Sequence, residues 1–161
     1  MRYLLLDRIT SLTPGERATG VKCISLADDV FVDHFPGHPV MPGALIIEAL
    51  AQLGGVLIEA TMRAKREGER GELHALLVMV DRARFRKMAR PGDRLLLEAT
   101  ALRVNEDGAR VEVVARTDEG IATTAELGYT FVLVDNDKLI ARRHEVLNVW
   151  LSGSSESGEL A

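Results

Sequence analysis

Between residues 34 and 48 the chain carries a base, an acid and a stretch of backbone suited to an anion. His34 supplies an imidazole, which gains and loses protons near neutral pH. Glu48 lies in an apolar run, where burial disfavours a charged carboxyl group, so this acid can hold and donate a proton. Gly43 begins a predicted helix, whose first N–H groups lack partners and favour a developing negative charge. The three groups predict a site that removes one proton and delivers another.

Two elements must position these groups, a rigid loop and a buried helix. Three prolines exclude helix and central strand from the loop over residues 34–43. A helix is predicted over residues 43–66, and its first part is apolar nearly all round, which is typical of a core helix. Glu48 and Gln52 are four residues apart, so they share one face of this helix.

The remainder of the chain predicts β-strands that pack on the helix. Gly54 and Gly55 should destabilise the helix by roughly 0.8–1 kcal/mol each relative to alanine. They therefore predict close approach of a partner backbone, such as a sheet wrapped round the helix. An antiparallel meander joined by Asp-Gly and Glu-Gly turns is expected after the helix. The predicted strands are 3–9, 17–26, 74–87, 94–104, 110–117 and 121–134, which gives an α+β fold class.

Two sequence motifs carry a resemblance to a known family. HFPGHPVMPG over residues 34–43, followed by EALAQ over 48–52, closely resembles the signature of the β-hydroxyacyl-(acyl carrier protein) dehydratases of the FabZ/FabA type. The segment 4–9 looks like the opening strand of that family, and 81–93 looks like its second signature. The resemblance implies a hotdog fold over residues 1–134, with an antiparallel sheet wrapped around a long central helix.

The resemblance also implies a role for each residue of the site. His34 would take the α-proton of a 3-hydroxyacyl thioester, and Glu48 would protonate the departing β-hydroxyl to leave a trans-2-enoyl thioester. The Gly43 N–H would polarise the thioester carbonyl. Gln52 would orient Glu48, and the Val40 carbonyl would hold the tautomer of His34. The implied activity is 3-hydroxyacyl-[acyl-carrier-protein] dehydratase, a hydro-lyase of fatty-acid or related polyketide-like synthesis.

The same resemblance implies the partners of the site. The acyl group would be carried on the phosphopantetheine of acyl carrier protein or on CoA, and no metal or organic cofactor is implied. His34 and Glu48 of one site would come from different protomers, so a homodimer is the minimum catalytic unit. A trimer of dimers stays open at this point, as do acyl chain length, the pathway served and the preference between carrier protein and CoA.

A basic cluster stands out in a chain whose net charge is −4. Two interpretations stay open for it: a solvated strand edge, or a landing patch for an acidic acyl carrier protein. Nucleic acid is not expected as a partner, because stacking aromatics do not interleave with the basic residues. The residues are Arg82, Arg84, Arg86, Lys87, Arg90 and Arg94.

Other features limit the location and the class of protein. The opening residues do not resemble a secretory signal, and the apolar run 44–58 falls short of the ~20 residues that span a bilayer. We therefore expect a cytoplasmic protein without a membrane partner. The single cysteine, Cys23, is predicted to be a small buried side chain. His38, His74 and His144 share no metal-ligand spacing, so they are predicted to be structural.

The C-terminal part departs from the family. Residues 135–161 are predicted to be an extension, with a short amphipathic helix over 138–151 and then a Gly/Ser/Glu-rich disordered tail. Asp33 stands where the family usually has a glycine. These departures keep two alternatives open: an acyl-CoA hydratase or thioesterase of the hotdog superfamily, or a non-catalytic hotdog subunit of a dehydratase complex.

Overall fold

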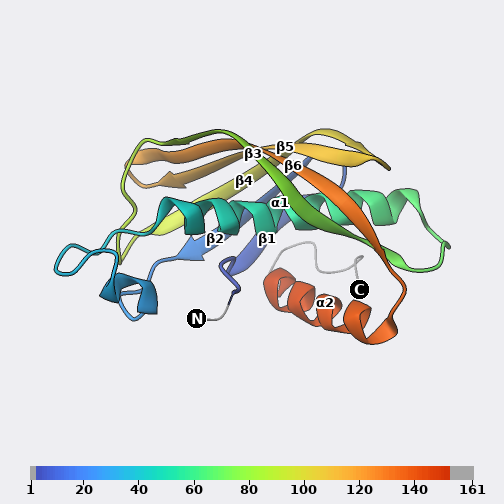
Figure 1. Ribbon diagram of the computed structural model, residues 1–161, viewed down its shortest axis with the longest axis horizontal. Helices are drawn as coiled ribbons and strands as arrows, with labels where there is room; N and C mark the ends of the chain where they lie inside the picture. Colours follow the sequence, from blue (N-terminus) through green and yellow to red (C-terminus); the bar gives the residue numbers. More distant parts are fainter. Residues whose placement is uncertain (1–2, 153–161) are drawn as a thin grey trace.

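A computed structural model describes residues 3–152 of the chain. Six strands form one antiparallel sheet in the order β1-β2-β4-β5-β6-β3, and this sheet wraps around helix α1 (Figure 1). The elements in chain order are β1 (Arg8–Thr13), β2 (Arg17–Cys23), the 3-10 helix η1 (Asp29–Val32), α1 (Gly43–Lys65), β3 (Glu72–Phe85), β4 (Arg94–Asn105), β5 (Gly108–Thr117), β6 (Gly120–Val134) and α2 (Asp137–Leu151).

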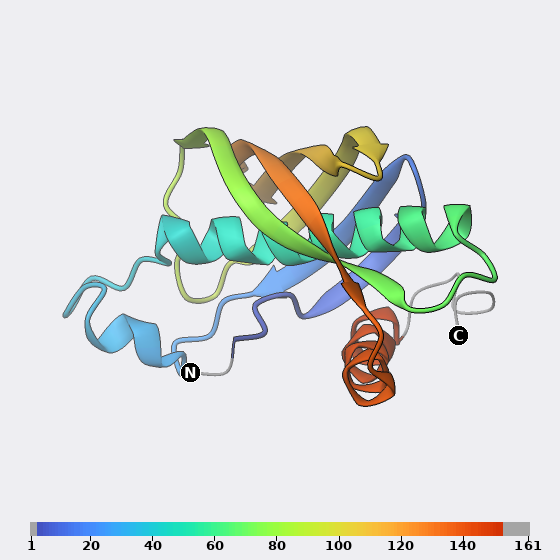
Figure 2. The same ribbon diagram turned by 45° about the vertical axis from the view of Figure 1, so that its right-hand side comes forward.

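The central helix α1 occupies the inside of the curved sheet, as Figure 2 shows from a second direction. Its side chains are buried from Ala49 to Met62 with the exception of Gln52. The helix has enough length and hydropathy to cross a membrane, although the apolar run alone was predicted to be too short. Most of it is covered by the rest of the protein. The predicted α+β arrangement of a sheet around a long helix is confirmed.

The predicted meander is present as β4, β5 and β6, which pair antiparallel in sequence order. Ala99 of β4 lies opposite Val113 of β5, which in turn lies opposite Ala125 of β6. All three side chains are buried, because alternate residues of a strand face the same side and here face the helix. β3 completes the sheet beside β6 rather than beside β4.

The predicted first strand, 3–9, is displaced in the structure, where β1 covers Arg8–Thr13. The N–H groups of Leu5 and Leu6 donate to the side-chain oxygen of Gln52 on α1, at 2.9 and 3.1 Å, instead of joining the sheet. Residues 10–13, which follow the predicted strand, belong to β1. Within them Leu12 is buried, so the apolar side of β1 faces the core.

The glycine pair of α1 divides into two different environments. A methyl group built on Gly54 would lie 2.5 Å from the hydroxyl oxygen of Tyr129, which donates to the Ala51 carbonyl at 3.0 Å. A methyl group on Gly55 would meet only the Ala75 side chain, at 3.9 Å. The prediction of a close backbone is therefore wrong: the close approach occurs at Gly54 alone, and the side chain of Tyr129 makes it.

The prediction for the cysteine is wrong, since Cys23 is exposed at the end of β2. Its neighbour Lys22 is buried instead, with its ammonium group 3.4 Å from Asp7. The backbone N–H of Cys23 donates to the other oxygen of Asp7 at 2.6 Å. An ion pair therefore makes burial of the lysine tolerable at this position.

The helix α2 starts one residue before the predicted 138–151 segment and packs against β1. Asn136 caps it, because its side-chain oxygen accepts from the N–H groups of Lys138 and Leu139 at 3.1 and 3.2 Å. Leu147 and Trp150 are buried against the body of the protein. Residues 153–161 of the predicted tail lie outside the described part. The division into residues 1–134 and 135–161 stays a prediction.

Candidate active site

His34 lies in a tight loop between η1 and α1. Its N–H donates to the Val30 carbonyl, and its carbonyl accepts from the Val40 N–H, both at 3.0 Å. The side-chain Nδ1 lies 2.7 Å from the Val40 carbonyl oxygen. Because a carbonyl oxygen can only accept, Nδ1 carries the proton of the neutral ring and Nε2 keeps a free lone pair. The ring stacks on Phe35, with centroids 4.1 Å apart.

The loop is held against the segment that follows β3. The N–H of Met41 donates to the Ala89 carbonyl at 2.7 Å, and Met41 itself is buried. The N–H of His38 donates to the Phe35 carbonyl at 2.9 Å, so the loop also closes on itself. These backbone contacts fix the direction of the His34 imidazole. On an unconstrained loop the ring would have no fixed direction.

Glu48 and Gln52 lie on one face of α1, as their spacing predicted, and both are half-buried. The amide Nε2 of Gln52 donates to Oε1 of Glu48 at 3.0 Å. The side chain of Tyr3 is hydrogen-bonded to Glu48 as well. The charge of Glu48, with burial and that hydrogen bond, raises the pKa of Tyr3. Within residues 3–152 the carboxylate of Glu48 has no cationic partner.

Gly43 is the first residue of α1, and its N–H has no acceptor among the described residues. A methyl group built on Gly43 would lie 2.6 Å from the ring of Phe85 at the end of β3. Only glycine therefore lets the aromatic ring cover the helix start. This arrangement leaves an N–H at the positive end of the helix dipole, beside an apolar wall.

His34 and Glu48 are separate within one chain. Among the described residues, 3–152, no hydrogen bond or ion pair joins the side chain of His34 to that of Glu48. Each has its own support, from the Val40 carbonyl in one case and from Gln52 in the other. The loop and the helix thus present a base and an acid without pairing them.

The basic cluster is exposed throughout. Arg82 lies 3.4 Å from Glu126 and 3.6 Å from its neighbour Asp81. Lys87 donates to the Glu119 carbonyl. In the described chain neither Arg84 nor Arg86 takes part in an ion pair, so those two charges face solvent.

Arg90 has weaker contacts: a guanidinium nitrogen lies 3.5 Å from the His38 ring and 3.7 Å from the sulfur of Met88. Arg90 is therefore the member of the cluster that reaches the loop carrying His34. Both interpretations of the cluster remain compatible with these positions.

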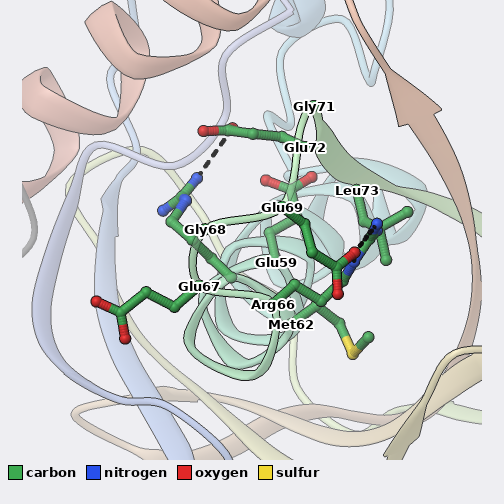
Figure 3. Close-up of a pocket in the computed structure, with 10 residues that line it drawn as sticks. Glu59, Met62, Arg66, Glu67, Gly68, Glu69, Gly71, Glu72 and Leu73 are labelled. Atoms are coloured by element: carbon green, nitrogen blue, oxygen red, sulfur yellow. Dashed lines mark hydrogen bonds and ion pairs between the residues drawn. The ribbon is translucent and has the colours of Figure 1, made fainter.

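Cavities lie at both ends of α1. One of about 260 Å³ near the helix start is lined in part by Leu4, Lys22 and Leu45, and its lining includes neither His34 nor Glu48. Another, of about 220 Å³, lies at the far end, where Glu59, Glu69 and Glu72 surround it (Figure 3). Over residues 3–152 no group of three or more His, Cys, Asp or Glu side chains is arranged to hold a metal ion.

Comparisons with known proteins give the family of this chain. The family model of the FabA-like domain matches residues 1–124. A 3-hydroxyacyl-[acyl-carrier-protein] dehydratase FabZ from Caulobacter vibrioides is 40% identical over 124 residues, which cover 77% of this chain and 76% of that relative. The chain belongs to the FabA-like family.

Solved structures show the fold of this FabA-like chain. The dehydratase heterocomplex ApeI:P from Xenorhabdus doucetiae aligns with a TM-score of 0.65 and 18% identity, over 88% of this chain and 90% of that chain. A hot-dog-like protein from Thermanaerovibrio acidaminovorans aligns with a TM-score of 0.59 and 21% identity, over 84% and 93% of the two chains. The predicted hotdog fold is confirmed.

Three residues near the site of this FabA-like chain had no predicted role. Phe85 covers Gly43, Tyr129 contacts the carbonyl of α1 one residue before Gln52, and Tyr3 contacts Glu48. Of the sequence features, only the glycine pair in α1 indicated that another group would approach the helix closely. Phe85 and Tyr3 come from strand ends and termini whose position depends on the packing of the whole chain.

Proposed function

We propose that the protein is a 3-hydroxyacyl-[acyl-carrier-protein] dehydratase, which removes water from a 3-hydroxyacyl thioester to give the trans-2-enoyl thioester. The relatives with this name support the assignment. The observation that carries it is the contact between His34 Nδ1 and the Val40 carbonyl at 2.7 Å. This contact leaves Nε2 as a base that cannot be turned away from substrate without loss of a hydrogen bond.

In the proposed reaction His34 Nε2 removes a proton from C2 of the acyl group. The electron pair of that C–H bond forms the C2–C3 double bond as the C3–O bond breaks. Glu48 delivers its proton to the departing hydroxyl, which leaves as water. One proton is taken and one is given, so the two residues exchange protonation states over a turnover. No resident cofactor is part of the proposal.

The charge that develops on the thioester oxygen needs a donor, and we assign this role to the Gly43 N–H, which has no acceptor among the described residues. The helix dipole of α1 adds a partial positive charge at the same point. Removing one such donor in other enzymes costs roughly 3–4 kcal/mol of transition-state stabilisation. The ring of Phe85, which lies on Gly43, would form an apolar wall on one side of this oxygen.

A homodimer is part of the proposal. β3 is an edge of the sheet, and it carries exposed apolar residues, among them Leu76 (50% exposed), Val78 (64%) and Val80 (46%). A long apolar edge strand invites pairing with another chain. Pairing of β3 with the β3 of a second copy would bury these side chains. We further propose that, in such a dimer, the partner subunit's His34 completes the site of Glu48, as the family resemblance implies. A trimer of dimers stays open.

The basic cluster is proposed to receive the acidic acyl carrier protein, since Arg84 and Arg86 are exposed and have no ion-pair partner among the described residues. Opposite charges at such a surface raise the rate of association more than the affinity. The proposal places the reaction in the cytoplasm and the catalytic domain in residues 1–134.

The deciding experiment follows the absorbance of the enoyl thioester with 3-hydroxyacyl substrates on carrier protein and on CoA. We expect double-bond formation by the wild type and its loss in both His34→Ala and Glu48→Gln. Release of free thiol in place of an enoyl product would instead indicate a thioesterase. A folded wild-type protein with no turnover on any substrate would contradict the proposal and favour a non-catalytic subunit.

A further inference from the structure

Gln52 joins the acid of the site to the N-terminal segment, residues 3–6. Its oxygen accepts from the backbone N–H groups of Leu5 and Leu6 at 2.9 and 3.1 Å. Its nitrogen donates to Glu48 Oε1 at 3.0 Å and to the Tyr3 carbonyl at 3.2 Å. Both polar atoms of the amide are therefore engaged, with two bonds each.

These partners settle which way the amide faces. Backbone N–H groups can only donate, so the side-chain oxygen of Gln52 must face Leu5 and Leu6. The amide NH₂ must then face Glu48. Leu5 and Leu6 are 6% and 2% exposed, which anchors the segment that sets this orientation.

The direction of the amide has a consequence for the acid. Oε1 of Glu48 receives a hydrogen bond from Gln52, and the carbonyl-type oxygen of a neutral carboxyl group is the better acceptor. The neutral acid therefore carries its proton on Oε2, the oxygen that Gln52 leaves free. The Tyr3 side chain, hydrogen-bonded to Glu48, adds a second contact from the same segment.

We propose that residues 3–6 are a positioning element of the active site, which acts through Gln52 to place the transferable proton of Glu48 on Oε2. This inference rests on the proposed dehydratase function. It assigns a role to a segment that packs beside the site and supplies none of the reacting groups. Gln52 and Tyr3 are positioning residues here, because they act through Glu48.

The test uses a proline that deletes one backbone donor. Leu5→Pro removes one of the two backbone N–H groups that bind Gln52, whereas Leu5→Ala keeps both and removes more of the side chain. We expect kcat to fall roughly tenfold in Leu5→Pro and clearly less in Leu5→Ala, with KM within about twofold of wild type. Gln52→Met should lower kcat by roughly 10- to 100-fold, a part of what general acid catalysis contributes.

The double variant Leu5→Pro/Gln52→Met decides whether the segment acts through Gln52. We expect its kcat to equal that of Gln52→Met alone, because the amide that transmits the effect is already gone. Losses that multiply would overturn the proposal, as would an unchanged kcat in Leu5→Pro. Both results differ from failure of the dehydratase assignment, in which the wild type itself forms no enoyl thioester.

A measurement without turnover covers the case in which the proline variant fails to fold. Amide hydrogen exchange at Leu5 and Leu6 should be slow in the wild type and at least roughly tenfold faster in Gln52→Met. The amide of Met41, bonded to Ala89, is the internal control and should keep its rate. Fast exchange at Leu5 and Leu6 in the wild type would overturn the proposal.

Discussion

Two glutamates of α1 have different surroundings. Glu59 is 6% exposed, and Arg143 of α2 donates to its Oε2 through two nitrogens at 3.0 and 2.9 Å. The N–H of Ala75 donates to its other oxygen at 2.9 Å. Glu48, about three turns earlier on the same helix, is only half-buried and is bonded to the uncharged side chains of Gln52 and Tyr3.

The difference separates an acid that holds the fold together from an acid that can do chemistry. Two guanidinium N–H groups of Arg143 donate to one oxygen of Glu59, so this acid is held in a charge-assisted pair that ties α2 to α1. Glu48 has no such cation in residues 3–152, and the side chains that bond it, Gln52 and Tyr3, are uncharged. A general acid must change its protonation state in each turnover, so the acid without a cation beside it is the one that we assign to catalysis.

Tyr129 lies between Glu48 and Glu59, and the charges of both acids affect its pKa. Its hydroxyl donates to the Ala51 carbonyl at 3.0 Å. Burial raises the pKa of Tyr129, and the charges of Glu48 and Glu59 raise it further. The hydroxyl therefore stays protonated and provides a neutral contact in the middle of α1. Tyr129 thus adds no charge beside Glu48 or Glu59.

The largest expected effect comes from removing the charge of each acid in turn. Glu48→Gln should lower kcat by about 10²–10⁴-fold, the usual contribution of general acid–base catalysis, and should leave the thermal unfolding midpoint nearly unchanged. Glu59→Gln should lower the thermal unfolding midpoint and leave kcat nearly unchanged, because it leaves Arg143 without its carboxylate. Enoyl-thioester absorbance and thermal unfolding at one protein concentration give both results. An equal loss of activity in the two variants would contradict the division of roles.

Breaking the ion pair from its other side should also destabilise the fold. Arg143→Ala leaves the buried Glu59 charge unpaired, and we expect a loss of about 2–4 kcal/mol in the free energy of unfolding. Arg143 also lies 5.6 Å from the ring centre of Trp150, so the anchor of α2 is weakened at the same time.

The matched control for this loss is the double variant Glu59→Met/Arg143→Met. It replaces the pair by apolar side chains and should recover most of the lost stability. Urea unfolding measures both variants. A double variant no more stable than Arg143→Ala would show that the loss came from packing and not from an unpaired charge.

The dependence of stability on pH extends the comparison to a third acid, Glu72, which lies near the end of α1 that carries Glu59. Burial alone would raise the pKa of Glu72, but Arg63 at 3.2 Å and His144 at 2.8 Å lower it below the usual 4.5. A pKa lowered in the folded state adds stability that is present above about pH 4.5 and is lost as the pH falls further. Glu72→Gln should therefore flatten the fall in stability below pH 4.5, measured by urea unfolding from pH 3 to 6. An unchanged slope would contradict this contribution.

The smallest effect is expected between the two acids, at the glycine pair. Gly55→Ala should stabilise the protein by up to about 1 kcal/mol, since alanine favours the helix and the new methyl group meets only Ala75 at 3.9 Å. Gly54→Ala should destabilise it, because the methyl group would lie 2.5 Å from the Tyr129 hydroxyl. Thermal unfolding compares the two variants. Equal shifts would mean that Tyr129 can move aside.

The loop, the helix and the meander could be predicted because each depends on local chemistry. Prolines restrict the loop, an apolar surface on all sides requires a buried helix, and Asp-Gly turns join antiparallel strands. The pairing of Gln52 with Glu48 follows from helical spacing alone. The first strand was misplaced because Leu5 and Leu6 bond a side chain on α1, a contact across more than forty residues of sequence. No local pattern reports such a contact.

The sequence by itself determined which residues could do acid–base chemistry, since residue type and helical periodicity are properties of short segments. Only the tertiary structure decided which glutamate of α1 has a cation beside it. Both acids lie in the same helix, but Arg143 comes from α2 and reaches Glu59 alone. Whether a carboxyl group is held ionised depends on the charges that other elements bring to it, and those are set by how the whole chain packs.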